Sequence, residues 1–416
     1  MLLGCIADDF TGASDAASFL VKGGMQTLLL NGIPEHIDKS EIARADAVVI
    51  ALKTRTQETV SAVEDSLNAI RWLRKNGARH FYVKYCSTFD STPSGNIGPI
   101  CDKVMEYLGV QFTLLCPSLP VNGRIVKDGI LYVNGVPLAK SHMKNHPLTP
   151  MHESDIALLM QPQSKYISHK LSAEAADWQE QIASVATARK EKHFYLIPDY
   201  VTDEDAVKII EKFGNLPLLT GGSGVLTAWA EYLANKQKCH TAKMAGTHGT
   251  GILLAGSCSK ATLAQIAYTK KQGVPCFKLK PQEIIAGRQT LADIEEFLKQ
   301  HTGNTVLIYS SETPEYLEAI RGTDLPAFSR ALEKMTADIA VLARNTGISR
   351  IIVAGGETSG AVTKALGYSA YWIGTSIAPG VPMMTPVEKP ELRLVLKSGN
   401  FGQEDFFQRA LQITGC

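Results

Sequence analysis

Two adjacent carboxylates, Asp8 and Asp9, follow a short apolar run at the start of the chain, Leu2–Ala7. The apolar run is typical of a buried strand, and the small residues that come after the acids are typical of a helix start. Acids at the end of a strand are placed to accept a proton from a hydroxyl group or to bind Mg²⁺. An equally good interpretation is that one acid caps the helix and the other is solvated. Asp15, further along, most simply favours the helix dipole.

Basic side chains come at or shortly after the ends of other strand-like runs in the first half. These are Arg55, Lys84 and Arg124. A guanidinium group binds a carboxylate through two parallel hydrogen bonds, which suits an acidic substrate. Each basic residue alone is better interpreted as a solvated surface charge. Their shared position after parallel strands nevertheless predicts that they converge.

A long polar loop follows Lys84 and ends with Ser94, Gly95 and Asn96. Small hydroxyl and amide side chains beside one lysine suit a small, anionic, hydroxyl-rich ligand. The loop therefore joins the acids and the basic residues as a candidate substrate site.

The second half of the chain concentrates glycine-rich turns between strand-like and helix-like segments. The turns are Gly256–Ser259, Gly355–Gly360 and Lys397–Gly402. Glycine lets a backbone approach a ligand closely, and helix N-termini direct free N–H groups at anions. Any one turn is more simply a strand end and a helix cap, but three at one sheet edge predict a phosphate-binding crevice. The candidate residues are Ser257, Ser259, Gly355, Gly356, Thr358, Ser359, Gly360, Gly399, Asn400 and Gly402.

Other familiar signatures are missing from the sequence. It contains no GxxxxGK[ST] segment and no GxGxxG with an acid about 20 residues later, which argues against a nicotinamide-dependent oxidoreductase. His142 and His146 are four residues apart, but no third ligand is evident, so we expect no metal site built by protein ligands alone.

Strand-like runs alternate with amphipathic helical stretches along the whole chain. This pattern predicts an α/β fold with two domains, each a mostly parallel sheet flanked by helices, and an active site in the cleft between them. We place the domains at 1–236 and 251–416, joined by a linker at 237–250. Asp128-Gly129 and Asn134-Gly135 predict a small hairpin excursion within the first domain.

Composition narrows the class of protein. The 416 residues are 45% hydrophobic and 20% charged, with a formal net charge of +1. We therefore expect no nucleic-acid or membrane partner. The Cys residues are scattered and form no CxxC, and the start does not resemble a signal peptide, so we expect a cytoplasmic protein. Composition leaves assembly into a homo-oligomer open.

Five segments, in order along the chain, resemble the four-carbon acid sugar kinase family. The segments are Ala7–Asp15, Ser91–Gly98, Cys116–Arg124, Gly355–Gly360 and Lys397–Gly402. The opening block and Asn122–Leu138 are most similar to the 3-oxo-tetronate kinases of that family.

The resemblance implies that the first domain binds a sugar acid and the second binds ATP, with Mg²⁺. It implies phosphorylation of the 4-hydroxyl of 3-oxo-tetronate, or alternatively of D-threonate or D-erythronate. A non-catalytic regulator that binds a sugar acid is a further alternative. By motif, the resemblance implies catalytic roles for Asp8, Asp9, Lys84 and Arg124, and substrate contacts for Thr11, Arg55, Ser94, Gly95 and Asn96.

Overall fold

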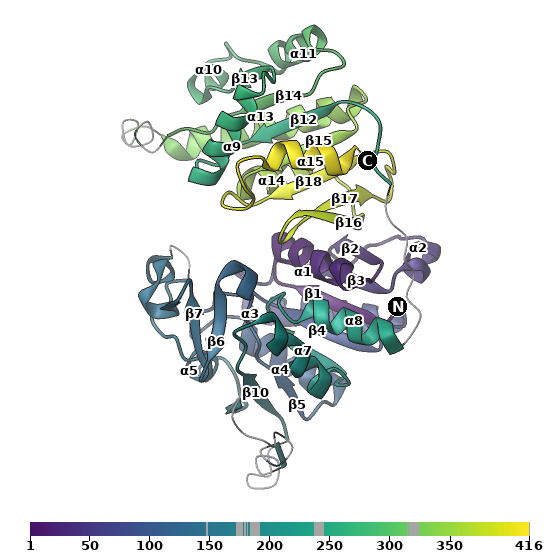
Figure 1. The fold of residues 1–416 in the computed structure, drawn as a ribbon, viewed down its shortest axis with the longest axis vertical. Coiled ribbons are helices and arrows are strands. Elements are labelled where there is room, and N and C mark those ends of the chain that lie inside the picture. Colours follow the sequence, from purple (N-terminus) through teal and green to yellow (C-terminus); the bar gives the residue numbers. More distant parts are fainter. Residues whose placement is uncertain are drawn as a thin grey trace. The chain divides into compact units, whose positions relative to one another are not determined.

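The computed structural model describes residues 1–146, 149–171, 178, 180, 182–183, 192–236, 245–313, 315 and 324–415. The chain divides into two compact units, Met1–Ala242 and Lys243–Cys416. Each unit contains a set of mostly parallel strands with flanking helices, which confirms the α/β prediction (Figure 1). Of the expected linker 237–250, residues 237–244 lie outside the described residues, and 245–250 form no helix or strand.

The main sheet of the first unit is parallel, in the strand order β11-β4-β1-β3-β2. Its central strands are buried on both faces, as their unbroken apolar runs require. Ala7 of β1 pairs with Ala51 of β3 and Lys84 of β4, so the segments that follow these strands leave the same edge. The strands are β1 (Leu3–Ala7), β2 (Thr27–Asn31), β3 (Ala47–Ala51), β4 (His80–Lys84) and β11 (Leu218–Gly221).

Helices cover both faces of this sheet. The connection from β1 to β2 and the connection from β3 to β4 run in opposite directions across it, so right-handed crossovers place α1 and α3 on opposite faces. α3 packs directly over Gly4, where a Cβ atom would lie 3.0 Å from Leu73 Cβ. The helices are α1 (Phe10–Lys22), α2 (Lys39–Arg44), α3 (Thr59–Lys75), α4 (Ile97–Leu108), α5 (Ile156–Met160), α7 (Asp203–Phe213) and α8 (Leu226–Lys236).

Two smaller sheets complete the first unit. One is parallel, in the order β5-β10-β9, and the other is antiparallel, in the order β6-β7-β8. The antiparallel sheet is the predicted excursion: Asp128 and Asn134 both have positive φ at its turns, as do the glycines that follow them. The strands are β5 (Phe112–Leu114), β6 (Arg124–Lys127), β7 (Ile130–Val133), β8 (Val136–Pro137), β9 (Ser168–Leu171) and β10 (Phe194–Pro198).

The sheet of the second unit has the order β16-β17-β18-β15-β12-β14-β13. β18, β15, β12, β14 and β13 are parallel, whereas β16 and β17 form an antiparallel hairpin that sequence analysis did not anticipate. The strands are β12 (Gly251–Ala255), β13 (Cys276–Lys278), β14 (Val306–Tyr309), β15 (Arg350–Ala354), β16 (Ala370–Ala378), β17 (Val381–Pro386) and β18 (Arg393–Lys397).

Three of these strands are adjacent and end level with one another. Ala354 of β15 pairs with Ala255 of β12 and with Lys397 of β18, so the glycine-rich segments after the three strands share one edge. The helices of this unit are α9 (Lys260–Lys271), α10 (Pro281–Ile285), α11 (Leu291–Gln300), α13 (Leu325–Asn345), α14 (Gly356–Leu366) and α15 (Phe406–Thr414). Across the described part of the chain, every helix is too short or too polar to cross a membrane.

Candidate active site

Asp8 and Asp9 lie where β1 ends and α1 begins, as predicted. Asp9 is the N-cap of α1, and its Oδ1 accepts a hydrogen bond from the backbone N–H of Gly12. A side chain at Gly12 would crowd this site, because its Cβ would lie 2.8 Å from Asp9 Oδ1 and 3.4 Å from Lys84 Nζ. Both interpretations of the acidic pair therefore apply in part, since one acid caps the helix while both face the same charged cluster.

Arg55 binds both acids. Its Nε lies 2.8 Å from Asp8 Oδ2, and its Nη2 lies 3.1 Å from Asp8 Oδ1 and 2.8 Å from Asp9 Oδ2. Burial alone would lower the pKa of Arg55, but the charges of Asp8 and Asp9 raise it by more than burial lowers it. The net pKa is therefore raised, and the guanidinium stays charged. Arg55 and the acidic pair thus lie together at the edge where β1 and β3 end.

Lys84 ends β4 and is almost fully buried beside the same acids. Its Nζ donates to the carbonyl oxygen of Tyr85 at 2.9 Å. Removal from water and the charge of Asp8 raise the pKa of Asp9, while Arg55 and the ammonium group of Lys84 oppose that rise. A carboxylate with a raised pKa is a better proton acceptor than an ordinary aspartate.

Asp15 belongs to this cluster, although its position in the sequence suggested only a helix-dipole role. Its Oδ2 accepts a hydrogen bond from Ser223 Oγ, and burial raises its pKa against the effect of the Lys84 charge. The signal available in the sequence was a carboxylate on the second turn of α1, facing the sheet among small buried residues.

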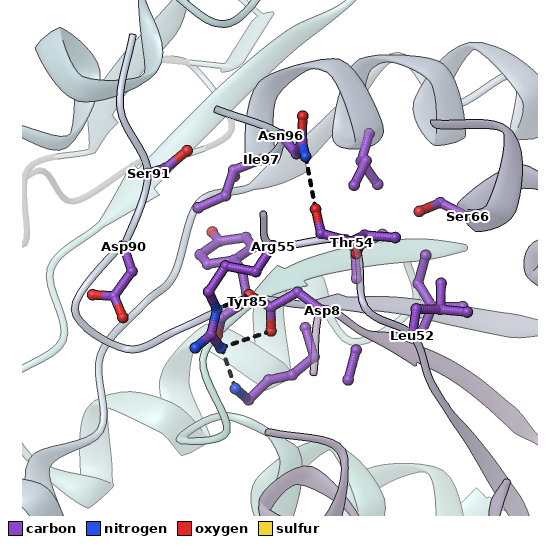
Figure 2. Close-up of a pocket in the computed structure, with 15 residues that line it drawn as sticks. Asp8, Leu52, Thr54, Arg55, Ser66, Tyr85, Asp90, Ser91, Asn96 and Ile97 are labelled. Atoms are coloured by element: carbon purple, nitrogen blue, oxygen red, sulfur yellow. Dashed lines mark hydrogen bonds and ion pairs between the residues drawn. The ribbon is translucent and has the colours of Figure 1, made fainter. Parts of the chain in front are cut away.

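A pocket opens at this edge of the sheet (Figure 2). Asp8, Arg55 and Lys84 contribute to its lining, and the polar loop after β4 contributes Asp90 and Ser91. Figure 2 shows these loop residues across the pocket from Leu52. Its volume of about 20 Å³ holds little more than one water molecule, so a sugar acid needs the loop or the side chains to move.

The remaining predicted substrate residues fall in different places. Asn96 lines the pocket, but its amide holds the neighbouring loop: Nδ2 donates to the carbonyl oxygens of Thr54 (2.7 Å) and Gln57 (2.8 Å). Its Oδ1 accepts from Thr59 Oγ1 at 2.9 Å. Thr11 and Ser94 are exposed, and Gly95 is partly exposed.

Arg124 is not among the residues that line this pocket. It begins β6, and its Nη1 donates to the carbonyl oxygen of Asn122. Its guanidinium therefore supports the turn before β6 in this structure, while the predicted contact with the substrate stays a prediction.

In the second unit, the three glycine turns meet. A Cβ atom at Gly256 would clash with Thr358 Oγ1, and one at Gly399 would clash with Ser257 Oγ. The turns after β12, β15 and β18 therefore lie against one another, and only glycine fits where they touch. Ser259 caps α9 by accepting from the N–H of Thr262 and donates to the carbonyl oxygen of Gly399 at 2.6 Å.

A pocket of about 680 Å³ opens beside these turns. One side consists of the turn residues Gly256, Ser257, Gly355, Gly356 and Thr358, at the N-terminal ends of α9 and α14. The lining also includes apolar residues from the start of α13, namely Leu325, Pro326, Phe328 and Leu332. Polar turns rich in N–H groups, in one pocket with apolar side chains, suit a ligand with a phosphate end and a flat base.

The other predicted phosphate-side residues surround these turns. Gly360 and Ser359 lie in α14, and the Ser359 hydroxyl donates to the carbonyl oxygen of Lys397 at 3.5 Å. Asn400 is exposed, whereas Gly402 has a positive φ and packs against the Phe406 ring. Asn400 and Gly402 belong to the β18–α15 turn, and none of these four residues lines the pocket.

Carboxylates at the second pocket are few. Glu312 and Glu357 line it, and Glu312 pairs with Lys278 at 2.9 Å. Within the described ranges, no group of three or more His, Cys, Asp or Glu residues is arranged to hold a metal ion. Magnesium bound by a nucleotide takes most of its ligands from phosphate and water, so one or two carboxylates fit that ion.

Fold and pockets together define a class: an α/β protein with a small pocket lined by charged residues in one unit and a larger pocket beside glycine turns in the other. Residues 3–229 match the model of a sugar-binding N-terminal domain, and residues 252–407 match that of a nucleotide-binding C-terminal domain. The chain belongs to the four-carbon acid sugar kinase family, close to its 3-oxo-tetronate kinases, and it is a kinase.

The relatives extend over the whole chain. It is 41% identical to the 3-oxo-tetronate kinase of Cupriavidus necator, covering 100% of this chain and 97% of that protein. It is 40% identical to the 3-oxo-tetronate kinase of Brucella melitensis, covering 99% of this chain and 96% of that protein. A crystal structure of a Salmonella typhimurium LT2 protein superposes with a TM-score of 0.90 at 37% identity, covering 99% of both chains. These findings set aside the oxidoreductase and regulator alternatives.

Proposed function

We propose that this kinase transfers the terminal phosphate of ATP to the 4-hydroxyl of 3-oxo-tetronate, giving ADP and 3-oxo-tetronate 4-phosphate. The observation that supports the nucleotide part is that three glycine turns meet and that two of them, after β12 and β15, line a pocket together with apolar residues from the start of α13. The names of the full-length relatives support the acid.

Arg55 is the group that we assign to the carboxylate of the acid. Among the described contacts, it binds Asp8 and Asp9 through Nε and Nη2, which leaves the N–H groups of Nη1 for a substrate. A planar guanidinium already held by two carboxylates is fixed in orientation, and a fixed donor loses little entropy on binding. Lys84 adds a second buried positive charge beside the acids.

Asp9 is the group that we assign as proton acceptor. In the transfer, the 4-hydroxyl oxygen forms a bond to the terminal phosphorus while the bond from that phosphorus to the bridging oxygen of ADP breaks. The hydroxyl proton passes to a carboxylate oxygen of Asp9, whose raised pKa suits that role. Asp8 is the alternative acceptor, but it holds Arg55 through two hydrogen bonds, whereas Asp9 makes one ion-pair contact with Arg55 and accepts one hydrogen bond from the N–H of Gly12.

The phosphates of ATP are assigned to the N–H groups of the glycine turns and to the hydroxyls of Ser257 and Thr358. Glu357, in the first turn of α14, is the carboxylate placed to bind Mg²⁺ that arrives with the nucleotide. That ion would neutralise charge that develops on the phosphate oxygens.

A coupled assay of ADP release tests the proposal with Mg-ATP and a panel of acids: 3-oxo-tetronates, D-threonate, D-erythronate and longer aldonates. Turnover confined to a 3-oxo-tetronate is the expected result. Turnover on D-threonate or D-erythronate alone would support the proposed phosphate transfer but contradict 3-oxo-tetronate as the substrate. Absence of ADP release with every acid would contradict the proposed reaction.

A further inference from the structure

Lys397 is a buried cation in the second unit, and the proposed reaction assigns no role to it. It is the last residue of β18 and is only 1% exposed. A buried ammonium is unfavourable unless it is paired or hydrogen-bonded, and a structural strand end in this place needs only an apolar side chain. In the described part of the chain, no carboxylate forms an ion pair with it.

The contacts of Lys397 reach all three glycine turns. Its Nζ donates to the carbonyl oxygens of Gly399 (2.9 Å) and Ser398 (3.3 Å), and to Thr262 Oγ1 (3.0 Å) in the first turn of α9. Its own carbonyl oxygen accepts from the N–H of Gly355 at 2.9 Å. The ammonium therefore links the turn after β18 to the start of α9, and the backbone carbonyl of Lys397 links β18 to the turn after β15.

The carbonyl oxygen of Gly399 is the centre of this arrangement. It accepts from Ser259 Oγ at 2.6 Å, from Lys397 Nζ at 2.9 Å and from Thr262 Oγ1 at 3.0 Å. Three donors on one carbonyl fix its direction, which keeps that oxygen within the protein. A carbonyl turned the other way would present a partial negative charge to the phosphates.

The number of N–H donors on Lys397 distinguishes direct contact with a phosphate from positioning of the turns around it. An ammonium group has three N–H bonds, and three acceptors lie within hydrogen-bond distance. None is left for a phosphate oxygen, unlike a lysine that contacts the nucleotide directly. The Phe406 ring, with its centroid 5.6 Å from Nζ, closes the site from α15.

We propose that Lys397 is a positioning residue for nucleotide binding: its ammonium ties the turn after β18 to the start of α9, which follows the turn after β12, and supplies an uncompensated positive charge beneath the phosphate site. This inference rests on the proposed nucleotide site and goes beyond it, because Lys397 itself touches no phosphate. Its neighbours from α9, α15 and the β18–α15 turn are hydroxyl, ring and backbone carbonyl groups.

The test measures binding of Mg-ADP by calorimetry in the absence of any acid. Lys397→Met is expected to raise the Kd for Mg-ADP at least about 10-fold, because it removes charged hydrogen bonds. Lys397→Arg, which keeps the charge, is expected to recover part of that loss. In the assay, the KM for ATP rises more than kcat falls. Lys334→Met, on the exposed face of α13, serves as the control.

A second pair of variants covers the case in which Lys397→Met does not fold. Thr262 and Thr269 are both buried on α9, but the Thr269 hydroxyl donates to the carbonyl oxygen of Gln265 in its own helix. Thr262→Val is expected to raise the Kd about 3- to 10-fold, and Thr269→Val to leave it unchanged.

Wild-type affinity for Mg-ADP in a folded Lys397→Met protein, or equal effects of the two threonine variants, would overturn the inference. The proposed reaction fails in a different way, by an absence of ADP release from the wild-type protein that still binds Mg-ADP.

Discussion

Arg55 grips the carboxylate of Asp8 at two points, with Nε 2.8 Å from Oδ2 and Nη2 3.1 Å from Oδ1. The two residues are 47 positions apart, and parallel pairing of β1 with β3 brings them together. A two-point contact fixes the plane of the guanidinium, which Asp9 also contacts at 2.8 Å, and a fixed plane is what the proposed contact with the carboxylate of the substrate requires.

Replacing Arg55 by methionine should therefore weaken binding of the acid. We expect the KM for the acid to rise about 10- to 100-fold, because charged hydrogen bonds are lost and Asp8 and Asp9 are left facing an anionic ligand. Arg55→Lys should recover little, since an ammonium cannot reproduce the planar contact. Steady-state kinetics with each substrate varied give the result, and a change of less than twofold in the KM for the acid would contradict it. The Kd for Mg-ADP is the internal control.

Asp9→Asn should separate stability from catalysis. Burial and the charge of Asp8 raise the pKa of Asp9, so its ionised form is less favourable in the folded state than in the unfolded chain. Ionisation of Asp9 therefore lowers stability as pH rises through and above the ordinary aspartate range. Asparagine still caps a helix, so at pH 7 we expect an unfolding free energy equal to or above that of the wild type.

Activity of Asp9→Asn should change in the opposite sense. Loss of a general base lowers kcat about 100-fold or more. Urea unfolding and the ADP-release assay on the same preparation test both parts. A kcat near that of the wild type would move the proton acceptor to another residue.

Asn96→Ala should act mainly on stability. The Asn96 amide is buried and makes hydrogen bonds to Thr54, Gln57 and Thr59, so its loss leaves buried carbonyl groups without a donor. We expect a fall of about 2–4 kcal/mol in the unfolding free energy. Ser94 lies on the same loop but is exposed, and Ser94→Ala should stay within about 0.5 kcal/mol. Urea denaturation distinguishes the two, and an equal effect on stability would refute this assignment.

Affinity for ATP should fall at alkaline pH. Burial lowers the pKa of Lys397 to about 8, so the ammonium loses its proton as pH rises through that value. The KM for ATP of the wild type should therefore rise above about pH 8, and that of Lys397→Met should lack this step. The contribution of Lys397 to stability has the opposite sign: because the unfolded chain holds the proton up to its ordinary pKa of 10.5, stability rises with pH in this window. Unfolding thus cannot imitate the predicted loss of affinity.

The sequence alone determined the alternation of strands and helices and the position of the chemical residues at strand ends. Apolar runs such as Leu3–Ala7 are long enough only for strands, and parallel strands in one sheet end at one edge. The sequence alone therefore predicted sheet-edge positions for Asp8, Asp9 and the glycine turns. The hairpin turns at Asp128-Gly129 and Asn134-Gly135 could also be predicted from the sequence, because few other residues tolerate positive φ.

Tertiary structure decided which of these residues share a site. Strand order is set by packing between distant segments, so the sequence did not show that Arg55 would reach Asp8 while Arg124 supports a separate turn. The antiparallel hairpin β16–β17 was missed, and so was the burial of the charged groups of Asp15 and Lys397. A buried charge has the same sequence signature as a solvated one, and only the groups packed around it reveal that it has left water.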